Sequence, residues 1–179
     1  MSNLEAVLTK ARAIRLLVLD VDGVLTDGSL YFHADGSESK VFNSLDGHGI
    51  KMLQASGVEV AIVTGRRSQM VAQRAQALAI KTVMQGREDK LVALKEIQET
   101  KKLDWSQIAY CGDDLPDLAA IRNAGLGITV PNAPEYIRGY ADYCCSVQGG
   151  QGAVREISDL IMKAQGTLQD AIDHYLLGF

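Results

Sequence analysis

Residues 16–28 read LLVLDVDGVLTDG, an apolar run that stops abruptly at carboxylates. The first four residues carry only aliphatic side chains, which is typical of a strand buried on both faces of a parallel sheet. Asp20 and Asp22 follow where this strand ends, and Asp27 comes shortly after. Burying an ionised carboxylate is costly unless a cation or hydrogen-bond donors compensate the charge. The stretch therefore favours a polar site at the carboxyl end of a buried strand.

Similar apolar runs recur along the chain and alternate with helical patterns. The β-rich runs lie at 14–20, 58–64, 81–84, 107–113, 126–130 and 143–147, and the helical patterns at 48–56, 67–79, 88–101, 115–123, 134–139 and 152–164. Such alternation predicts an α/β fold, a doubly wound, mostly parallel, Rossmann-like sheet with right-handed crossovers. A chain of 179 residues without an internal repeat or linker is expected to form a single domain over 1–179.

Two segments depart from this rhythm. Residues 29–43 (SLYFHADGSESKVFN) resemble two short strands around Asp35-Gly36, which predicts a β-hairpin flap over the carboxyl end of the sheet. The chain has room for this flap but for no large cap domain. Residues 166–179 form an amphipathic tail, and its apolar side chains, the last of which is Phe179, need a cover from this chain or from a partner subunit.

Composition argues against several classes of function. The formal net charge is −4, from 22 acidic and 18 basic residues, so we expect no nucleic-acid partner. No apolar run is long enough to span a bilayer and the N-terminal residues lack the core of a signal peptide, so we expect a cytoplasmic protein without a membrane partner. Cys111, Cys144 and Cys145 have no CxxC spacing and are expected to be reduced thiols.

Polar residues gather at the predicted carboxyl ends of the strands, where open α/β sheets bind their ligands. Asp20 and Asp22 follow the first strand, Thr64 the second and Asp113 a later one, while Lys90 lies near the start of a helix. Converging carboxylates repel each other without a cation, and a few hard oxygen ligands suit Mg²⁺. We therefore expect a Mg²⁺ site that includes Asp20 and Asp113, with Asp114 as a further candidate ligand.

This set of residues fits phosphoryl transfer. Asp20 is suited to act as a nucleophile that forms an aspartyl-phosphate, and Asp22 to protonate the leaving alcohol and then activate water. The Thr64 hydroxyl, the Gly65 amide and the Lys90 ammonium would hold the phosphoryl oxygens. Taken alone, an Asp-x-Asp or a Thr-Gly is more often a turn, and a lone lysine is usually exposed. Their conjunction at successive strand ends favours one shared site.

The motifs DVDGVLTDG, VTGR, Lys90 and GDDLPD resemble, in this order, the four motifs of the haloacid dehalogenase (HAD) superfamily. The resemblance covers nearly the whole chain. It implies a HAD-like sheet, with Asp20 as nucleophile, Asp22 as general acid/base and Thr64 and Lys90 as phosphate ligands. It also implies that Mg²⁺ is held by Asp20, Asp113 and the backbone carbonyl of Asp22.

A closer resemblance points to one family of phosphoric monoester hydrolases within that superfamily. DVDGVLTDG, DGHGIK (46–51), TGRRS, GDDLPD and GGQGAVRE (149–156) are similar to the 3-deoxy-D-manno-octulosonate 8-phosphate (KDO 8-P) phosphatases. The resemblance implies hydrolysis of KDO 8-P to KDO and phosphate in lipopolysaccharide precursor biosynthesis, by a homotetramer with active sites at subunit boundaries. The implied substrate-binding residues are a loop of Asn43, Ser44, Leu45, Asp46 and Gly47, together with Lys51, Gly65, Arg66 and Arg74.

Alternatives remain open at this point. A HAD phosphatase for a related nine-carbon sugar acid phosphate would have a similar sequence. A phosphoacceptor receiver domain also combines acids, a threonine and a lysine on a parallel sheet, but its acceptor aspartate follows a later strand than Asp20 does here. A dinucleotide-binding enzyme and a P-loop ATPase are disfavoured, because neither GxGxxG after the first strand nor GxxxxGK[ST] is present.

Overall fold

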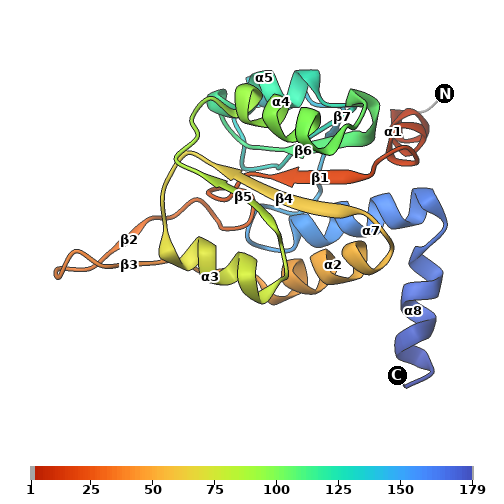
Figure 1. Cartoon of the computed structure of the whole chain (residues 1–179), viewed down its shortest axis with the longest axis horizontal. Helices are drawn as coiled ribbons and strands as arrows, with labels where there is room; N and C mark the ends of the chain where they lie inside the picture. The colour runs from red at the N-terminus through yellow and green to blue at the C-terminus, as the bar shows by residue number, and fades with distance from the viewer. Residues whose placement is uncertain (1–2, 179) are drawn as a thin grey trace.

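The structure of the chain, a computed structural model, describes residues 3–178. Six strands form one sheet in the order β5-β4-β1-β6-β7-β8 (Figure 1). They are β1 (Leu16–Leu19), β4 (Glu59–Thr64), β5 (Thr82–Gln85), β6 (Ile108–Cys111), β7 (Leu126–Thr129) and β8 (Tyr143–Cys144). Every neighbouring pair is parallel. The predicted doubly wound α/β architecture is confirmed.

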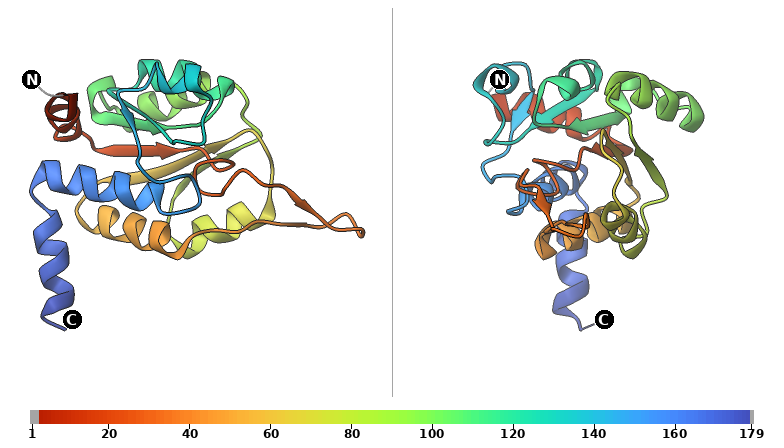
Figure 2. Two further views of the ribbon diagram at one scale, coloured as in Figure 1. Left: turned by 180° about the vertical axis from the view of Figure 1, so that it is seen from behind. Right: turned by 90° about the vertical axis from the view of Figure 1, so that its left-hand side faces the viewer.

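Helices cover both faces of the sheet. One face carries α4 (Lys90–Lys101) and α5 (Leu115–Asn123), and the other carries α2 (Ser44–Ala55), α3 (Gln69–Ala77) and α7 (Ala153–Gln165) (Figures 1 and 2). The short helices are a 3-10 turn at Trp105–Gln107 and α6 (Glu135–Arg138). The remaining helices, α1 (Asn3–Ala11) and α8 (Leu168–Leu176), both contact α7.

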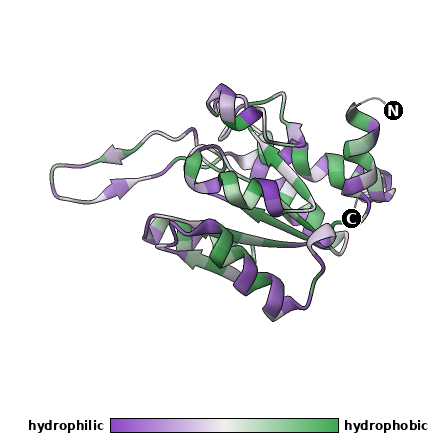
Figure 3. Ribbon diagram, turned by 90° about the horizontal axis from the view of Figure 1, so that it is seen from above, coloured by the Kyte–Doolittle hydropathy of each residue, from purple (hydrophilic) through white to green (hydrophobic). Residues whose placement is uncertain are grey.

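The aliphatic run at residues 16–19, which forms β1, is at the centre of the core. All residues of β1 and β6 are buried, as expected for parallel strands with helices on both faces. Figure 3 shows hydrophobic residues concentrated in the strands, with polar residues on the outer helices. Because β4 and β6 flank β1, side chains that follow these three strands are neighbours in space.

The predicted hairpin is present as β2 (Tyr31–Phe32) paired antiparallel with β3 (Glu38–Ser39). At its tip Gly36 has a φ of +85°, a conformation that favours glycine. Asp35 Oδ1 accepts a hydrogen bond from the Ser37 backbone N–H at 2.9 Å. Figure 2 shows the hairpin projecting from the carboxyl end of the sheet. Its position agrees with the predicted flap.

Two segments differ from the sequence prediction. α1 was not predicted, and it buries Val7 and Ala11 in the core. α2 begins at Ser44 rather than at residue 48, so most of the expected substrate-binding loop is the first turn of a helix. Asn43 is its N-cap, with Oδ1 accepting from the Leu45 backbone N–H at 2.8 Å.

The expected tail forms helix α8, which turns away from α7 and extends from the body (Figure 1). It has no fully buried residue, and Tyr175, Leu176 and Leu177 are exposed. Phe179 lies outside the described residues. Within residues 3–178, no helix combines the length and the apolar character needed to cross a membrane.

Candidate active site

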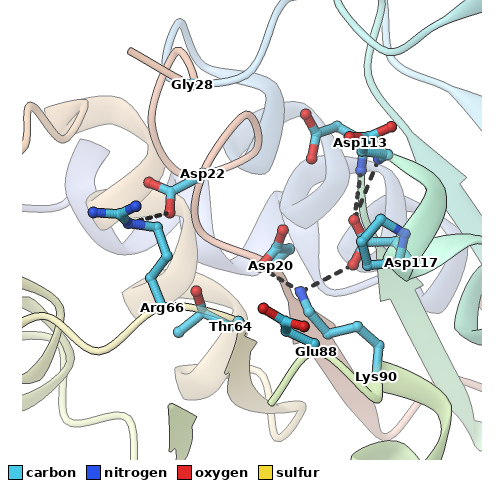
Figure 4. Close-up of a pocket in the computed structure, with 12 residues that line it drawn as sticks. Asp20, Asp22, Gly28, Thr64, Arg66, Glu88, Lys90, Asp113 and Asp117 are labelled. Carbon is cyan, nitrogen blue, oxygen red and sulfur yellow. Dashed lines mark hydrogen bonds and ion pairs between the residues drawn. The ribbon is translucent and has the colours of Figure 1, made fainter. Parts of the chain in front are cut away.

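A cavity of about 330 Å³ lies at the carboxyl edge of the sheet. Its walls include Asp20, Thr64, Lys90 and Asp113, the four residues that the strand-end argument brings together (Figure 4). Asp20 and Asp113 follow β1 and β6, Thr64 ends β4, and Lys90 begins α4. The complete lining is Asp20, Asp22, Gly28, Thr64, Gly65, Arg66, Glu88, Lys90, Asp113, Asp114, Pro116 and Asp117.

Asp20 follows β1 directly and forms an ion pair with Lys90. The Lys90 side chain is 3% exposed, and its Nζ lies 2.7 Å from Asp20 Oδ1. The ammonium also donates to the Val63 carbonyl at 3.1 Å and to Asp117 Oδ1 at 3.0 Å. Burial by itself would lower the pKa of Lys90, but the charges of Asp20 and Asp117 outweigh it and raise the pKa. Lys90 is therefore a fixed cation within a buried acidic cluster.

Asp117, for which no role was predicted, lies at the centre of this cluster. Its Oδ1 accepts from the Tyr110 hydroxyl at 2.6 Å, and its Oδ2 accepts from the backbone N–H groups of Asp113 and Asp114 at 3.2 and 3.3 Å. The signal for it lies in GDDLPD, because Asp114 is the N-cap of α5 and Asp117 is its reciprocal capping partner. Asp117 thus links the buried lysine to the loop that carries Asp113.

Three carboxylates form a candidate metal site. Asp20, Asp113 and Asp117 each place an oxygen within 4.8 Å of the others. Burial, together with the charge of Asp117, raises the pKa of Asp20 to about 6 and the pKa of Asp113 to about 7. A divalent cation would relieve this repulsion, and carboxylate oxygens are the donors that Mg²⁺ prefers. The donor set fits the predicted metal.

Gly23 provides the space that the Asp113 carboxylate occupies. It has a φ of +86°, and a Cβ at this position would lie 2.0 Å from Asp113 Oδ2. Gly149 packs on the same loop, since a Cβ there would lie 1.8 Å from the Gly23 carbonyl oxygen. Asn132 joins the two, donating to the Gly23 carbonyl and accepting from the Gly149 N–H, both at 2.9 Å. The GGQG segment therefore supports the DVDG loop.

Asp22 lies in the loop after β1, with cations beside both carboxylate oxygens. The Lys40 ammonium forms an ion pair with Oδ1, and Arg66 Nε lies 3.9 Å from Oδ2. The Arg66 guanidinium also lies 3.5 Å from Glu38 Oε2 and 5.6 Å from the centre of the Phe32 ring, both in the hairpin. The Asp22 carboxylate is not part of the three-carboxylate cluster. A metal contact through the backbone carbonyl of Asp22 stays a prediction.

Thr64 and Gly65 line the cavity on the β4 side. Thr64 is the last residue of β4 and is 2% exposed. Since β4 pairs directly with β1, Thr64 lies beside the strand end that carries Asp20. The arrangement offers a hydroxyl and a backbone amide next to the carboxylate cluster. Phosphate binding by the two residues stays a prediction.

Four lining residues have no predicted role: Gly28, Glu88, Pro116 and Asp117. Asp114 lines the cavity but is not part of the three-carboxylate group. Gly28 closes the DVDGVLTDG motif, and Glu88 stands two positions before Lys90. Pro116 lies in the first turn of α5, inside GDDLPD. These residues lie in the motifs or within two positions of Lys90. That proximity could have predicted them, because residues next to a site residue in sequence lie at the same edge of the sheet.

Of the predicted substrate-binding residues, Gly65 and Arg66 line the cavity of their own chain. The others lie elsewhere in this chain: Asn43, Ser44, Leu45, Asp46, Gly47, Lys51 and Arg74. Most of them belong to the N-cap and first two turns of α2. The single chain therefore brings together the residues predicted for phosphoryl transfer, but only two of the residues predicted to bind the sugar.

Asp46 points at helix α7 instead of the cavity. It is 2% exposed, and its Oδ1 accepts from the Arg155 backbone N–H at 2.9 Å. Burial raises its pKa, although backbone N–H groups of Arg155, Gly152 and Val154 and the charge of Arg74 oppose the rise. The Asp46 side chain thus caps the N-terminus of α7.

Arg74 and Gly47 form a local contact between α3 and α2. Arg74 Nη2 donates to the Asn43 carbonyl at 3.0 Å, and the guanidinium lies 5.7 Å from the centre of the Phe42 ring. A Cβ on Gly47 would lie 2.2 Å from Arg74 Nη2, so the glycine makes room for the arginine. Lys51 lines a separate cavity of about 480 Å³ between α2 and α8.

Comparisons with known proteins agree with the motifs. The profile of the haloacid dehalogenase-like hydrolase family matches residues 82–157. The 3-deoxy-D-manno-octulosonate 8-phosphate phosphatase KdsC of Escherichia coli (strain K12) is 44% identical over 165 residues, which is 92% of this chain and 88% of that protein.

Solved structures give the same result. The probable YrbI family phosphatase of Pseudomonas syringae superposes with a TM-score of 0.96 at 52% identity, covering 98% of this chain and 99% of that one. The 3-deoxy-D-manno-octulosonate 8-phosphate phosphatase of Moraxella catarrhalis, solved in complex with a magnesium ion, a phosphate ion and KDO, has a TM-score of 0.93 at 45% identity, covering 94% and 97%. The chain therefore belongs to the KDO 8-P phosphatase family of the haloacid dehalogenase superfamily.

Proposed function

We propose that this chain is a Mg²⁺-dependent phosphomonoesterase that hydrolyses KDO 8-P to KDO and inorganic phosphate in lipopolysaccharide precursor biosynthesis. The observation that carries the proposal is the buried carboxylate of Asp20, held 2.7 Å from Lys90 at the wall of a polar cavity. The relatives from Escherichia coli and Moraxella catarrhalis, which this chain matches over most of their length, are KDO 8-P phosphatases. Membership of that family argues against the receiver-domain alternative.

The proposed reaction uses two carboxylates in sequence. An oxygen of Asp20 attacks phosphorus while the bond to the sugar oxygen breaks, and Asp22 gives its proton to the departing alkoxide. Asp22 then takes a proton from water, whose oxygen attacks the phosphorus of the aspartyl-phosphate. The bond between phosphorus and the Asp20 oxygen breaks, which regenerates the Asp20 carboxylate and releases inorganic phosphate, and Asp22 is protonated again for the next cycle.

The other lining residues would bind charge in this scheme. Lys90, Thr64 and Gly65 offer an ammonium, a hydroxyl and an amide for the phosphoryl oxygens at the wall of the cavity. Mg²⁺, held by Asp20, Asp113 and the Asp22 carbonyl, would supply positive charge that neutralises the phosphoryl group. Asp117 would keep Lys90 and the Asp113 backbone in place through the contacts described above.

We also propose that the chain is one domain over 1–179 and that it assembles as a homotetramer with active sites at subunit boundaries. Lys51 and Arg74 do not line the cavity of their own chain, which supports a role for them toward a neighbouring one. The exposed apolar side chains of the hairpin and of α8, such as Phe32 and Leu176, support burial in an assembly. Three unbridged cysteines support a reducing compartment, the cytoplasm.

The test is a phosphate-release screen of the purified protein with and without Mg²⁺. The panel contains KDO 8-P, the phosphate of a related nine-carbon sugar acid, and common hexose and pentose phosphates. We expect the highest kcat/KM for KDO 8-P and loss of turnover in chelator. A higher kcat/KM for the nine-carbon substrate would replace the proposed substrate, and equal turnover in chelator would remove the proposed metal.

A further inference from the structure

The hairpin contributes one buried cation to the region of the active site. Lys40 follows β3, and its ammonium pairs with Asp22 Oδ1. The Lys40 side chain is 2% exposed, whereas hairpin residues such as Tyr31, Phe32 and Val41 are exposed. A lysine side chain is almost never buried without a charged or hydrogen-bonding partner. The ion pair with Asp22 supplies that partner, 18 residues away in sequence.

Lys40 approaches Asp22 from outside the cavity. Asp22 and Arg66 are part of the lining, and Lys40 is not. A substrate in the cavity would therefore meet the Asp22 carboxylate but not the Lys40 ammonium. Lys40 is therefore placed to act on the reaction through its contact with Asp22.

Arg66, the second cation beside Asp22, is held less firmly. Its side chain is 41% exposed, its Nε lies 3.9 Å from Asp22 Oδ2, and it also contacts Glu38. Lys40 is the closer and the buried partner of Asp22, and it holds one of the two carboxylate oxygens. The hairpin is thereby coupled to the orientation of Asp22.

We propose that Lys40 is a positioning residue that orients Asp22 for proton transfer to the leaving alcohol. The inference rests on the proposed function, in which Asp22 is the general acid/base. Proton transfer requires the acid within hydrogen-bond reach of the leaving oxygen, and a small displacement of a catalytic group costs much of its effect. A carboxylate on a loop without a fixed partner would spend much of its time in other rotamers.

The dependence on the leaving group distinguishes this role from a general structural one. KDO 8-P releases a primary alkoxide, which needs a proton as the bond to phosphorus breaks. p-Nitrophenyl phosphate releases a stabilised phenolate, which needs little assistance. The ratio kcat/KM reports the steps up to departure of the leaving group, so a misplaced Asp22 lowers it for the first substrate and not for the second.

The variant Lys40→Met keeps the length of the buried stem and removes the charge. We expect kcat/KM to fall by about 10- to 100-fold for KDO 8-P, a part of the usual contribution of general acid catalysis, and by less than about 3-fold for p-nitrophenyl phosphate. Lys40→Gln, which keeps an N–H donor, should lie between wild type and Lys40→Met. Lys10→Met is the control, since it removes an ion pair of 2.6 Å with Asp142, and neither residue lines the cavity.

Activity on p-nitrophenyl phosphate also shows that each variant is folded, and Lys40→Gln serves if Lys40→Met does not fold. An equal fall for both substrates would overturn the proposal, because it would mean a loss of fold or of general phosphate attraction. Unchanged kcat/KM for KDO 8-P would overturn it as well. If the wild-type enzyme prefers another alkyl phosphate, the proposed substrate fails, and the same comparison with that alkyl phosphate still decides the role of Lys40.

Discussion

Replacing Asp113 by asparagine removes one charge from the carboxylate cluster while the shape of the side chain is kept. Burial first, and then the charges of Asp117 and Asp20, raise the pKa of Asp113 from 3.8 to about 7 in the metal-free protein. In the unfolded chain the same group ionises near its ordinary value. The folded state therefore becomes less stable, relative to the unfolded state, as the pH rises from about 4 to 7.

The size of this effect follows from the pKa. Each pKa unit corresponds to about 1.4 kcal/mol, so the full difference amounts to about 4 kcal/mol at pH 8. Water in the open cavity screens the repulsion, and we expect about half of that value, about 2 kcal/mol, to appear as stability. For a chain of this size the variant should then melt about 4–8 °C above wild type at pH 8 without metal.

Thermal unfolding measures this difference directly. In chelator, Asp113→Asn should melt above wild type at pH 8, and the gap should narrow at pH 5, where the folded wild-type protein carries the proton. Mg²⁺ at about 100 times its Kd should then stabilise wild type by about 2.7 kcal/mol and the variant much less. A variant that melts below wild type at pH 8 in chelator would refute the repulsion argument, and equal stabilisation of both proteins by Mg²⁺ would refute the assigned metal ligand.

Other perturbations test separate parts of the site. Asp20→Asn should abolish phosphate release and leave the circular dichroism spectrum unchanged, and measurable turnover would remove Asp20 from the nucleophile role. Tyr110→Phe deletes the 2.6 Å hydrogen bond to Asp117 and should cost about 1–3 kcal/mol of unfolding free energy in denaturant titration. An unchanged midpoint would show that other donors satisfy Asp117. Truncation after Gly166 removes α8 and should lower the assembly mass in light scattering or change the steady-state kinetics, and identical values in both would make α8 a surface helix.

Much of the fold follows from local patterns. Continuous aliphatic runs such as 16–19 are typical of strands buried on both faces, and their alternation with helices leaves few topologies other than a doubly wound parallel sheet. The meeting of Asp20, Thr64, Lys90 and Asp113 follows as well, because carboxyl ends of adjacent parallel strands share one edge. The Asp35-Gly36 turn likewise predicts the hairpin.

Other elements depended on packing partners that periodicity does not identify. Residues 3–11 were not predicted as a helix, and their apolar face is buried by contact with α7, more than 140 positions later in the chain. The first turn of α2 was expected as a substrate loop, although the N-cap signal of Asn43 was available. In both cases the sequence does not tell which other element the segment packs against.

The sequence by itself determined the strand–helix order, the parallel sheet, the hairpin and the chemical types of residue at the sheet edge, because each depends on neighbours within one element. Only the tertiary structure decided that Asp46 caps α7, that Asp117 holds Lys90 and that Lys40 pairs with Asp22. These contacts join groups from different elements. Their partners are set by how helices and loops pack on the sheet, and the burial that packing imposes makes an unpaired charge too costly to leave.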